Sequence, residues 1–314
     1  MADKAPIRIG TRGSRLALWQ AGSARDALVA AHGLAPHAIE IVPIKTSGDK
    51  IRDRPLSEAG GKGLFSKEIE AALLAGEIDL AVHSAKDMET HLPDGLTIGA
   101  CLPREDVRDA LVARDAPTFE ALPQGARVGT ASLRREALLR RVRPDLRIEL
   151  LRGNVPTRVR KVESGELDAT LLAAAGLKRI GLEGKITALL PPDKFPPACG
   201  QGAIAVECRA NDARIRELLA AIDHRDTSLA LACERAFLAA LDGSCKTPIA
   251  GYARIEAGML LRFNGMILSE DGRESYEASA SGDPADATGI GREAGLEIRG
   301  KSPSDFLKRL GIGG

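Results

Sequence analysis

Two arginines stand at a helix start where acids would be expected. Arg134 and Arg135 fall in the first turn of a predicted helix, directly after the cap-like Ser132, and this end of the helix dipole favours negative charge. Residues 126–130 are predicted to form a strand, so backbone N–H groups and two guanidiniums would converge at a strand-to-helix turn. The pattern indicates an anionic partner that the local sequence does not supply.

The same pattern recurs at two more predicted strand ends. Arg12 follows one of these strands, and Arg152 follows another, with Arg158 shortly after it. For a single arginine the alternative is a surface ion pair with an acid such as Glu136. Three repeats favour instead a ligand that carries several carboxylates or phosphates.

Asp87 is the best candidate in the chain for a general acid or base. It follows an apolar strand that ends abruptly in Ser84, Lys86 and Asp87, and we expect it to be a single acid in a cation-rich cleft. The alternative is a turn acid that pairs with Lys86.

Two loops could bring further groups to such a site. The glycine-rich segment 60–63 lacks the spacing of a nucleotide-binding loop, so we predict a mobile loop that carries Lys62 to the ligand, or else an ordinary surface loop. Cys245 lies in a turn-like segment beside Lys246, a context that favours thiolate, although it could also be an ordinary loop thiol. Cys208 and Cys233 lie in apolar segments and are predicted to be buried structural thiols.

The composition narrows the class of protein. The chain has 314 residues, 44% hydrophobic and 28% charged, with a net charge of +1 and only 3% aromatics, which argues against bulk nucleic-acid binding. The first residues lack the apolar core of a signal peptide, and no stretch is long and apolar enough for a membrane helix. A soluble cytoplasmic protein is expected. The spacing of the cysteines and histidines predicts no metal site.

The order of elements predicts an α/β fold with largely parallel sheets in two similar domains. Helical stretches separate predicted strands at 7–10, 38–44, 80–83, 109–112, 126–130, 147–151, 169–173 and 203–208. The proline-rich run 189–197 can be neither helix nor central strand and is predicted to connect the domains. The last seventy residues are expected to form a small α+β domain with three strands and a closing helix.

Six segments in order resemble the porphobilinogen deaminase (hydroxymethylbilane synthase) family, from Ile7 through at least Gly251. They are Thr11-Arg12 with Leu16-Ala17-Leu18-Trp19-Gln20, Gly60-Gly61-Lys62-Gly63-Leu64-Phe65, Ala81-Val82-His83-Ser84-Ala85-Lys86-Asp87, Gly129-Thr130-Ala131-Ser132-Leu133-Arg134-Arg135, Leu151-Arg152-Gly153-Asn154-Val155 and Gly200-Gln201-Gly202. One such motif would be weak, but six in order are highly specific.

The resemblance implies a particular architecture. Two hinged α/β domains similar to periplasmic binding proteins would precede a small C-terminal α+β domain. The implied boundaries are 1–102 with 201–222 for the first domain, 103–200 for the second and 223–314 for the third. A monomer that binds neither membrane nor nucleic acid is expected.

The resemblance also implies the chemistry. Four porphobilinogen molecules would be condensed head to tail with loss of ammonia to linear hydroxymethylbilane, on a dipyrromethane cofactor held by Cys245 through a thioether. Asp87 would protonate the leaving amine, stabilise the resulting cation and take up the final proton. The expected binding groups for the cofactor and substrate carboxylates are Arg12, Ser84, Lys86, Thr130, Ser132, Arg134, Arg135, Arg152, Arg158 and Arg179, with Lys62 and Phe65 on the loop and Gln20 and Gln201 in the cleft.

Some positions depart from the family pattern. Glu58 stands where many relatives have lysine, and Glu89 where proline is usual. The main alternative function is a solute-binding protein for a small dicarboxylate, which would need neither Asp87 nor Cys245. A nucleotide-dependent transferase is a weaker third hypothesis, because the spacing of the glycines in segment 60–63 differs from that of a nucleotide-binding loop.

Overall fold

The computed structural model describes residues 6–50, 63–243 and 247–312 of the chain. They divide into two compact units, which are described separately. Unit 1 comprises residues 1–51, 60–105 and 203–228, and unit 2 comprises 52–59, 106–202 and 229–314. Lys62, Cys245 and Glu58 lie outside the described residues.

Unit 1 is built on a five-stranded sheet in the order β2-β1-β3-β10-β4. Its strands are β1 (Ile7–Arg12), β2 (Ile39–Ile44), β3 (Leu80–Ser84), β4 (Leu96–Cys101) and β10 (Ile204–Arg209). Its helices are α1 (Arg15–His32), α2 (Ser47–Lys50), α3 (Lys67–Leu74) and α7 (Ala213–Ala220), with single turns η1 (Pro36–Ala38) and η2 (Ala85–Asp87). The α1 and α7 helices cover one face of the sheet and α3 the other, so both faces are apolar.

Unit 2 contains a second sheet of the same design, in the order β7-β6-β8-β5-β9. Its strands are β5 (Asp109–Ala113), β6 (Arg127–Thr130), β7 (Arg147–Leu150), β8 (Ala169–Ala173) and the short edge strand β9 (Ala188–Leu189). The helices are α4 (Leu133–Val142), α5 (Val155–Glu163) and α6 (Ala174–Arg179), with the turn η3 (Glu183–Lys185). The α4 helix packs on one face, and α5 and α6 pack on the other.

The sheets are mixed, which corrects the expectation of largely parallel sheets. In unit 1, β10 runs antiparallel to both of its neighbours, and in unit 2, β5 does the same. Each of these strands enters its sheet from chain that belongs to the other unit, so it is not bound by the helical crossover that joins parallel neighbours. The predicted α/β class is confirmed.

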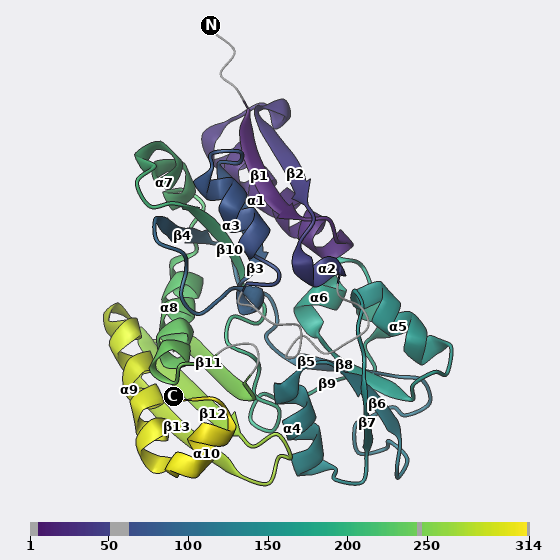
Figure 1. The fold of residues 1–314 in the computed structure, drawn as a ribbon. Coiled ribbons are helices and arrows are strands. Elements are labelled where there is room, and N and C mark those ends of the chain that lie inside the picture. Colours follow the sequence, from purple (N-terminus) through teal and green to yellow (C-terminus); the bar gives the residue numbers. More distant parts are fainter. Residues whose placement is uncertain (1–5, 51–62, 244–246, 313–314) are drawn as a thin grey trace, which may run out of the picture. The chain divides into compact units, whose positions relative to one another are not determined.

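The C-terminal part of unit 2 is a three-stranded antiparallel sheet, as predicted. Its elements are β11 (Ile249–Glu256), β12 (Leu260–Leu268), β13 (Ser275–Gly282), α8 (Arg225–Ala240), α9 (Ala287–Lys301) and α10 (Ser304–Arg309), with the turn η4 (Pro284–Asp286). Figure 1 shows α9 lying along the sheet. The alternating burial of β12 gives the sheet one apolar face, which the helices cover. No helix among the described residues is long and apolar enough to cross a membrane.

Two glycines of α9 allow it to approach α8 closely. A methyl group at Gly291 would overlap the carbonyl oxygen of Cys233, and one at Gly295 would press on the Phe237 carbonyl oxygen at 2.9 Å. A methyl group at Gly300, near the end of the same helix, would meet nothing within 4 Å.

We therefore predict opposite effects for two identical substitutions in this helix. Gly291→Ala should lower the free energy of unfolding by about 1–3 kcal/mol, because α9 must move away from α8. Gly300→Ala should leave it unchanged or raise it by about 0.5–1 kcal/mol through helix propensity. Urea unfolding of both variants tests this, and equal stabilities would contradict the close packing.

Candidate functional site

A small pocket of about 50 Å³ opens in unit 1 where β1 and β3 end. Its lining residues are Thr11, Arg12, Ser14, Leu16, Ala17, Gln20, Phe65, Val82, His83, Ser84 and Asp87. Because β1 and β3 are parallel neighbours, their carboxyl ends meet at one edge of the sheet, and ligands bind at such edges in α/β folds. Five of the predicted site residues are brought together here, namely Arg12, Gln20, Phe65, Ser84 and Asp87.

The helix that borders the pocket, α1, begins directly after Ser14. The Ser14 hydroxyl oxygen accepts a hydrogen bond from the Ala17 N–H at 3.2 Å and so caps α1. From the first turns of α1, the Gln20 amide donates to the Ser84 hydroxyl at 2.9 Å. This bond ties the helix to the end of β3.

Arg12 is held in a fixed orientation at the pocket. Its Nη2 lies 2.5 Å from Oδ1 of Asp49, its Nε lies 3.4 Å from Oδ2, and its guanidinium stacks over the Phe65 ring at 4.2 Å. Partial burial of Asp49 would raise the pKa of its carboxyl, but hydrogen bonding and attraction to Arg12 lower that pKa overall. Arg12 therefore presents a preoriented positive charge.

Asp87 differs from the other acids near the pocket. It lies in η2, is exposed and lines the pocket. Its carboxylate forms no hydrogen bond or ion pair with another described residue, so the alternative of a turn acid that pairs with Lys86 is not seen in the described part of the chain. Both oxygens of Asp87 can therefore meet a ligand.

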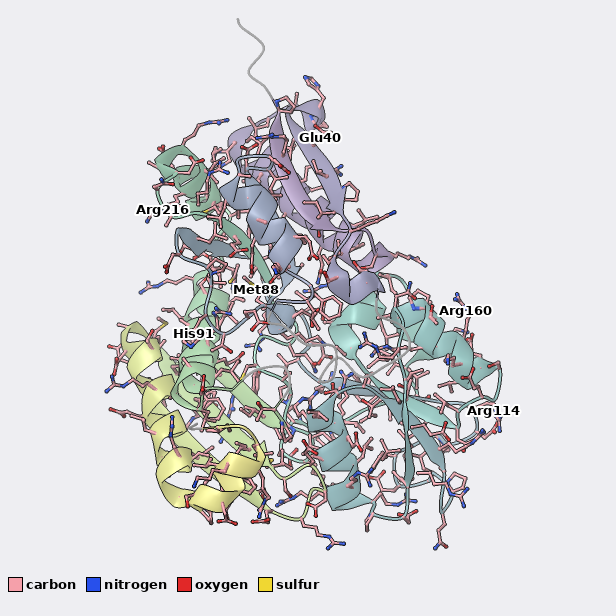
Figure 2. All side chains as sticks on the ribbon, in the orientation of Figure 1. Glu40, Met88, His91, Arg114, Arg160 and Arg216 are labelled. Atoms are coloured by element: carbon pink, nitrogen blue, oxygen red, sulfur yellow. The ribbon has the colours of Figure 1, made fainter. Side chains whose placement is uncertain are left out.

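In unit 2 the partner of the paired arginines is a buried acid. Nη2 of Arg134 lies 2.8 Å from Oδ2 of Asp109, and Nη2 of Arg135 lies 2.8 Å from Oδ1. The Gln201 amide donates to Oδ1 at 2.9 Å. All four residues are buried, unlike Arg114 and Arg160, which extend outward from unit 2 in Figure 2.

The electrostatics of this cluster follow from its burial. Burial would raise the pKa of the Asp109 carboxyl, but the charges of Arg134 and Arg135 hold that pKa well below its usual range. Burial lowers the pKa of the Arg134 guanidinium, against the attraction of Asp109. The internal carboxylate explains how two arginines are tolerated in the first turn of α4, whose N-cap is Ser132 as predicted.

The other residues of unit 2 that were predicted to bind the ligand contact neighbouring groups of the described chain. Thr130 accepts a hydrogen bond from the Ser132 N–H at 3.1 Å. Arg158 Nε donates to the Gly153 carbonyl at 2.8 Å, and Arg179 Nη2 to the Gly202 carbonyl at 2.6 Å. Arg152 is half-buried just before α5. Ligand binding by these residues stays a prediction.

Two acids that orient predicted site arginines, Asp109 and Asp49, were missed from the sequence. Asp109 is the first residue of an apolar strand, and Asp49 lies in a short helix. Neither residue has a neighbouring sequence pattern that indicates which arginine it contacts. The signal that could have found Asp109 is the isolated charge at the start of an otherwise apolar strand. Glu89, a departure from the family pattern, accepts a hydrogen bond from the Gly63 N–H and so holds the start of the segment that carries Phe65.

Comparison with known proteins gives consistent matches. The family model described as "Porphobilinogen deaminase, dipyromethane cofactor binding domain" matches residues 7–217, and "Porphobilinogen deaminase, C-terminal domain" matches residues 228–300. A porphobilinogen deaminase of Nitrobacter hamburgensis is 55% identical over 299 residues, which cover 95% of this chain and 94% of that protein.

Solved structures show weaker likeness. A periplasmic substrate-binding protein of an ABC transporter from Coxiella burnetii has a TM-score of 0.42 at 15% identity, over 69% of this chain and 91% of that one. A nutrient binding protein from Burkholderia cenocepacia bound to methionine has a TM-score of 0.42 at 14% identity, over 68% and 90%.

The Asp109 cluster predicts a large asymmetry between two aspartates. Asp109→Asn should lower the free energy of unfolding by about 3–5 kcal/mol, because two buried guanidiniums lose their counter-charge. Asp168→Asn removes the carboxylate of a partly exposed pair with Arg127 and should cost no more than about 1 kcal/mol. Urea unfolding measures both, and similar losses would contradict the assigned role of Asp109.

The pH dependence of stability should change in the same variant. A carboxyl with a lowered pKa in the native state stabilises fully above its unfolded pKa of about 4, and that contribution is lost as the pH falls toward the native pKa. The wild type should therefore lose stability below about pH 4 more steeply than Asp109→Asn. Urea unfolding repeated at several acidic pH values tests this, and parallel curves would contradict it.

Proposed function

This chain belongs to the porphobilinogen deaminase family, and we propose on that basis that it condenses four porphobilinogen molecules head to tail, releasing ammonia, to give linear hydroxymethylbilane. Family membership makes the chain an enzyme of porphyrin biosynthesis, and the condensation makes it a transferase. The single observation that supports this most strongly is the match of both family models along the chain. The pocket of unit 1, which combines Arg12 with Asp87, supports the proposal.

Arg12 would bind a carboxylate of the substrate. Porphobilinogen carries an acetate and a propionate group, and a planar guanidinium forms two parallel hydrogen bonds to such groups. Asp49 and Phe65 already fix the plane of the Arg12 guanidinium, so little conformational entropy is lost when a ligand binds.

Asp87 would move the protons. Its carboxyl would protonate the leaving amine, and its carboxylate would then stabilise the cation and accept the proton that the new bond releases. An exposed acid without a hydrogen-bond partner among the described residues suits this role, because its oxygens face whatever enters the pocket.

The residues also fit a dipyrromethane cofactor, which carries the same acidic side chains as the substrate. The donor set is cationic, and Nε of Arg134 is buried without a hydrogen-bond partner in the described part of the chain, which leaves a donor for an acidic group. When bound, the cofactor supplies the nucleophilic carbon from which the pyrrole chain grows. We propose that Cys245 holds it through a thioether, and that its acidic groups meet Arg12, Ser84, Lys86, Thr130, Ser132, Arg134, Arg135, Arg152, Arg158 and Arg179.

Further parts of the proposal concern the whole molecule. Lys62 and Phe65 would close over the ligand, and Gln20 and Gln201 would border it. We propose a cytoplasmic monomer of three domains (1–102 with 201–222, 103–200 and 223–314) that binds neither nucleic acid nor membrane and needs no metal. Among the described residues, no group of three metal-ligating side chains is found.

The covalent cofactor predicts a mass difference. Freshly purified protein should be heavier than its sequence by two pyrrole units on intact-mass measurement under denaturing conditions, and Cys245→Ser should have its sequence mass. Ser244→Ala, at the neighbouring position, should keep the adduct. A wild type with its bare sequence mass that releases no ammonia from porphobilinogen would favour the solute-binding alternative.

Asp87→Asn should lower kcat by about 10²–10⁴-fold, the usual contribution of a general acid or base. Asp94→Asn, in an exposed turn of the same unit, should turn over like the wild type. Ammonia release from porphobilinogen gives kcat, and the urea midpoint should stay the same in both variants. A wild-type kcat in Asp87→Asn would remove this residue from the mechanism.

A further inference from the structure

A buried polar pair adjoins the pocket of unit 1, whose lining includes His83. Nε2 of His83 on β3 lies 3.2 Å from Oε2 of Glu207 on β10. The side chains of His83 and Glu207 are 5% and 0% exposed, so both groups are shielded from solvent. The register pairs Ala205 with His83 and Ala81 with Glu207, which places both side chains on the same face of the sheet.

Part of that face is apolar. It packs against α3 through Ala81, Ile69 and Leu73, where two aliphatic side chains would suit the packing. Burying a carboxylate costs free energy unless it is well partnered, and Oε1 of Glu207 has no hydrogen-bond partner among the described residues. The pair therefore needs an explanation other than core packing.

Glu70 of α3 is the third titratable group at this interface. Burial raises the pKa of its carboxyl, and the nearby charge of Glu207 raises it further, against Ser66 and His83. Glu70 therefore tends toward its neutral form. The imidazole of His83 contacts Glu207, with Nε2 and Oε2 3.2 Å apart.

The pair completes the support of the strand end that forms the pocket. On the opposite face of the sheet, Gln20 bonds to Ser84 at 2.9 Å. At the edge, the Ala85 N–H donates to the Ala203 carbonyl at 3.1 Å. The bond between His83 and Glu207 holds the same strand end from the α3 face, and Asp87 follows within one helical turn.

We propose that Glu207 is a positioning residue of the reaction: by accepting a hydrogen bond from His83 it fixes the end of β3, and thereby the placement of Ser84 and Asp87 in the pocket. This role rests on the proposed function. Glu207 acts through His83 and the strand, and the hydrogen bond rather than the volume of the side chain matters.

The test compares a polar and an apolar replacement. Glu207→Gln keeps an oxygen that can accept from Nε2 and should retain at least about one third of kcat, since the strand end stays in place. His83→Leu combined with Glu207→Leu should be at least as stable as Glu207→Gln, because apolar groups replace a buried polar pair. Its kcat should nevertheless fall by about 10²-fold with little change in KM, because Asp87 is displaced.

Glu70→Gln is the control, since it alters the same interface without touching the bond, and it should turn over like the wild type. A purely structural role would rank kcat in the same order as stability across the three variants. That result, or a wild-type kcat in the apolar double variant, would overturn the proposal.

Hydrogen exchange gives a readout that does not depend on turnover. The peptide covering residues 83–88, followed by mass spectrometry, should exchange about tenfold faster in the apolar double variant than in the wild type and Glu207→Gln. Unchanged exchange would overturn the positioning role. If the wild type itself released no ammonia from porphobilinogen, the proposed function would fail, while the exchange result would still decide whether Glu207 fixes this strand end.

Discussion

The buried carboxylate of Asp109 is the interaction on which unit 2 depends. It joins β5, the first turn of α4 and the segment that leads to β10 through contacts with Arg134, Arg135 and Gln201. Arg134 and Arg135 come from one turn of α4 and Gln201 from a distant segment, so with β5 the charge joins three segments that no continuous element connects. A buried ion pair adds little net stability compared with good apolar packing, but breaking one is costly because the remaining charge stays buried. The cluster therefore specifies an arrangement more than it strengthens the fold.

The same logic applies at the strand end of unit 1. Arg12 meets the internal carboxylate of Asp49 and the ring of Phe65, just as Arg134 and Arg135 meet Asp109. In both units the guanidinium is oriented by an internal acid before any ligand arrives. Orientation of this kind lowers the entropic cost of binding a carboxylate, although a ligand must then share the arginine with its internal partner.

Local patterns in the sequence predicted local features well. Ser132 caps its helix as expected, and Cys208 and Cys233 are fully buried. Burial raises the pKa values of their thiols to about 11 and about 12. These features depend on residues a few positions apart, or on the apolar character of one element.

Contacts between residues far apart in the chain were not predicted from the sequence, because no local pattern encodes them. Glu207 meets His83 across 124 positions of the chain, and Asp109 meets Arg134 across 25. The two arginines at the start of α4 indicated an anionic partner, and Asp109, within the fold, is one such partner. The strands β5 and β10 were predicted, but their antiparallel direction was missed for the same reason, since direction depends on how the chain passes between units.

The acidic residues of this fold differ in whether their surroundings allow them to contact a ligand and to exchange a proton. Asp109 is buried between two guanidiniums, which keeps its pKa well below its usual range, so it stays ionised near neutral pH and cannot exchange protons during a reaction. Burial favours the neutral form of Glu70, and its oxygens are shielded from any ligand. Asp87 is exposed at the pocket, and its carboxylate is not committed to a described neighbour. In the proposed mechanism Asp87 gains and loses a proton in each cycle, and direct ion pairing would fix its charge. Support through its backbone avoids this, and the strand end contacted through His83 and Gln20 offers such support.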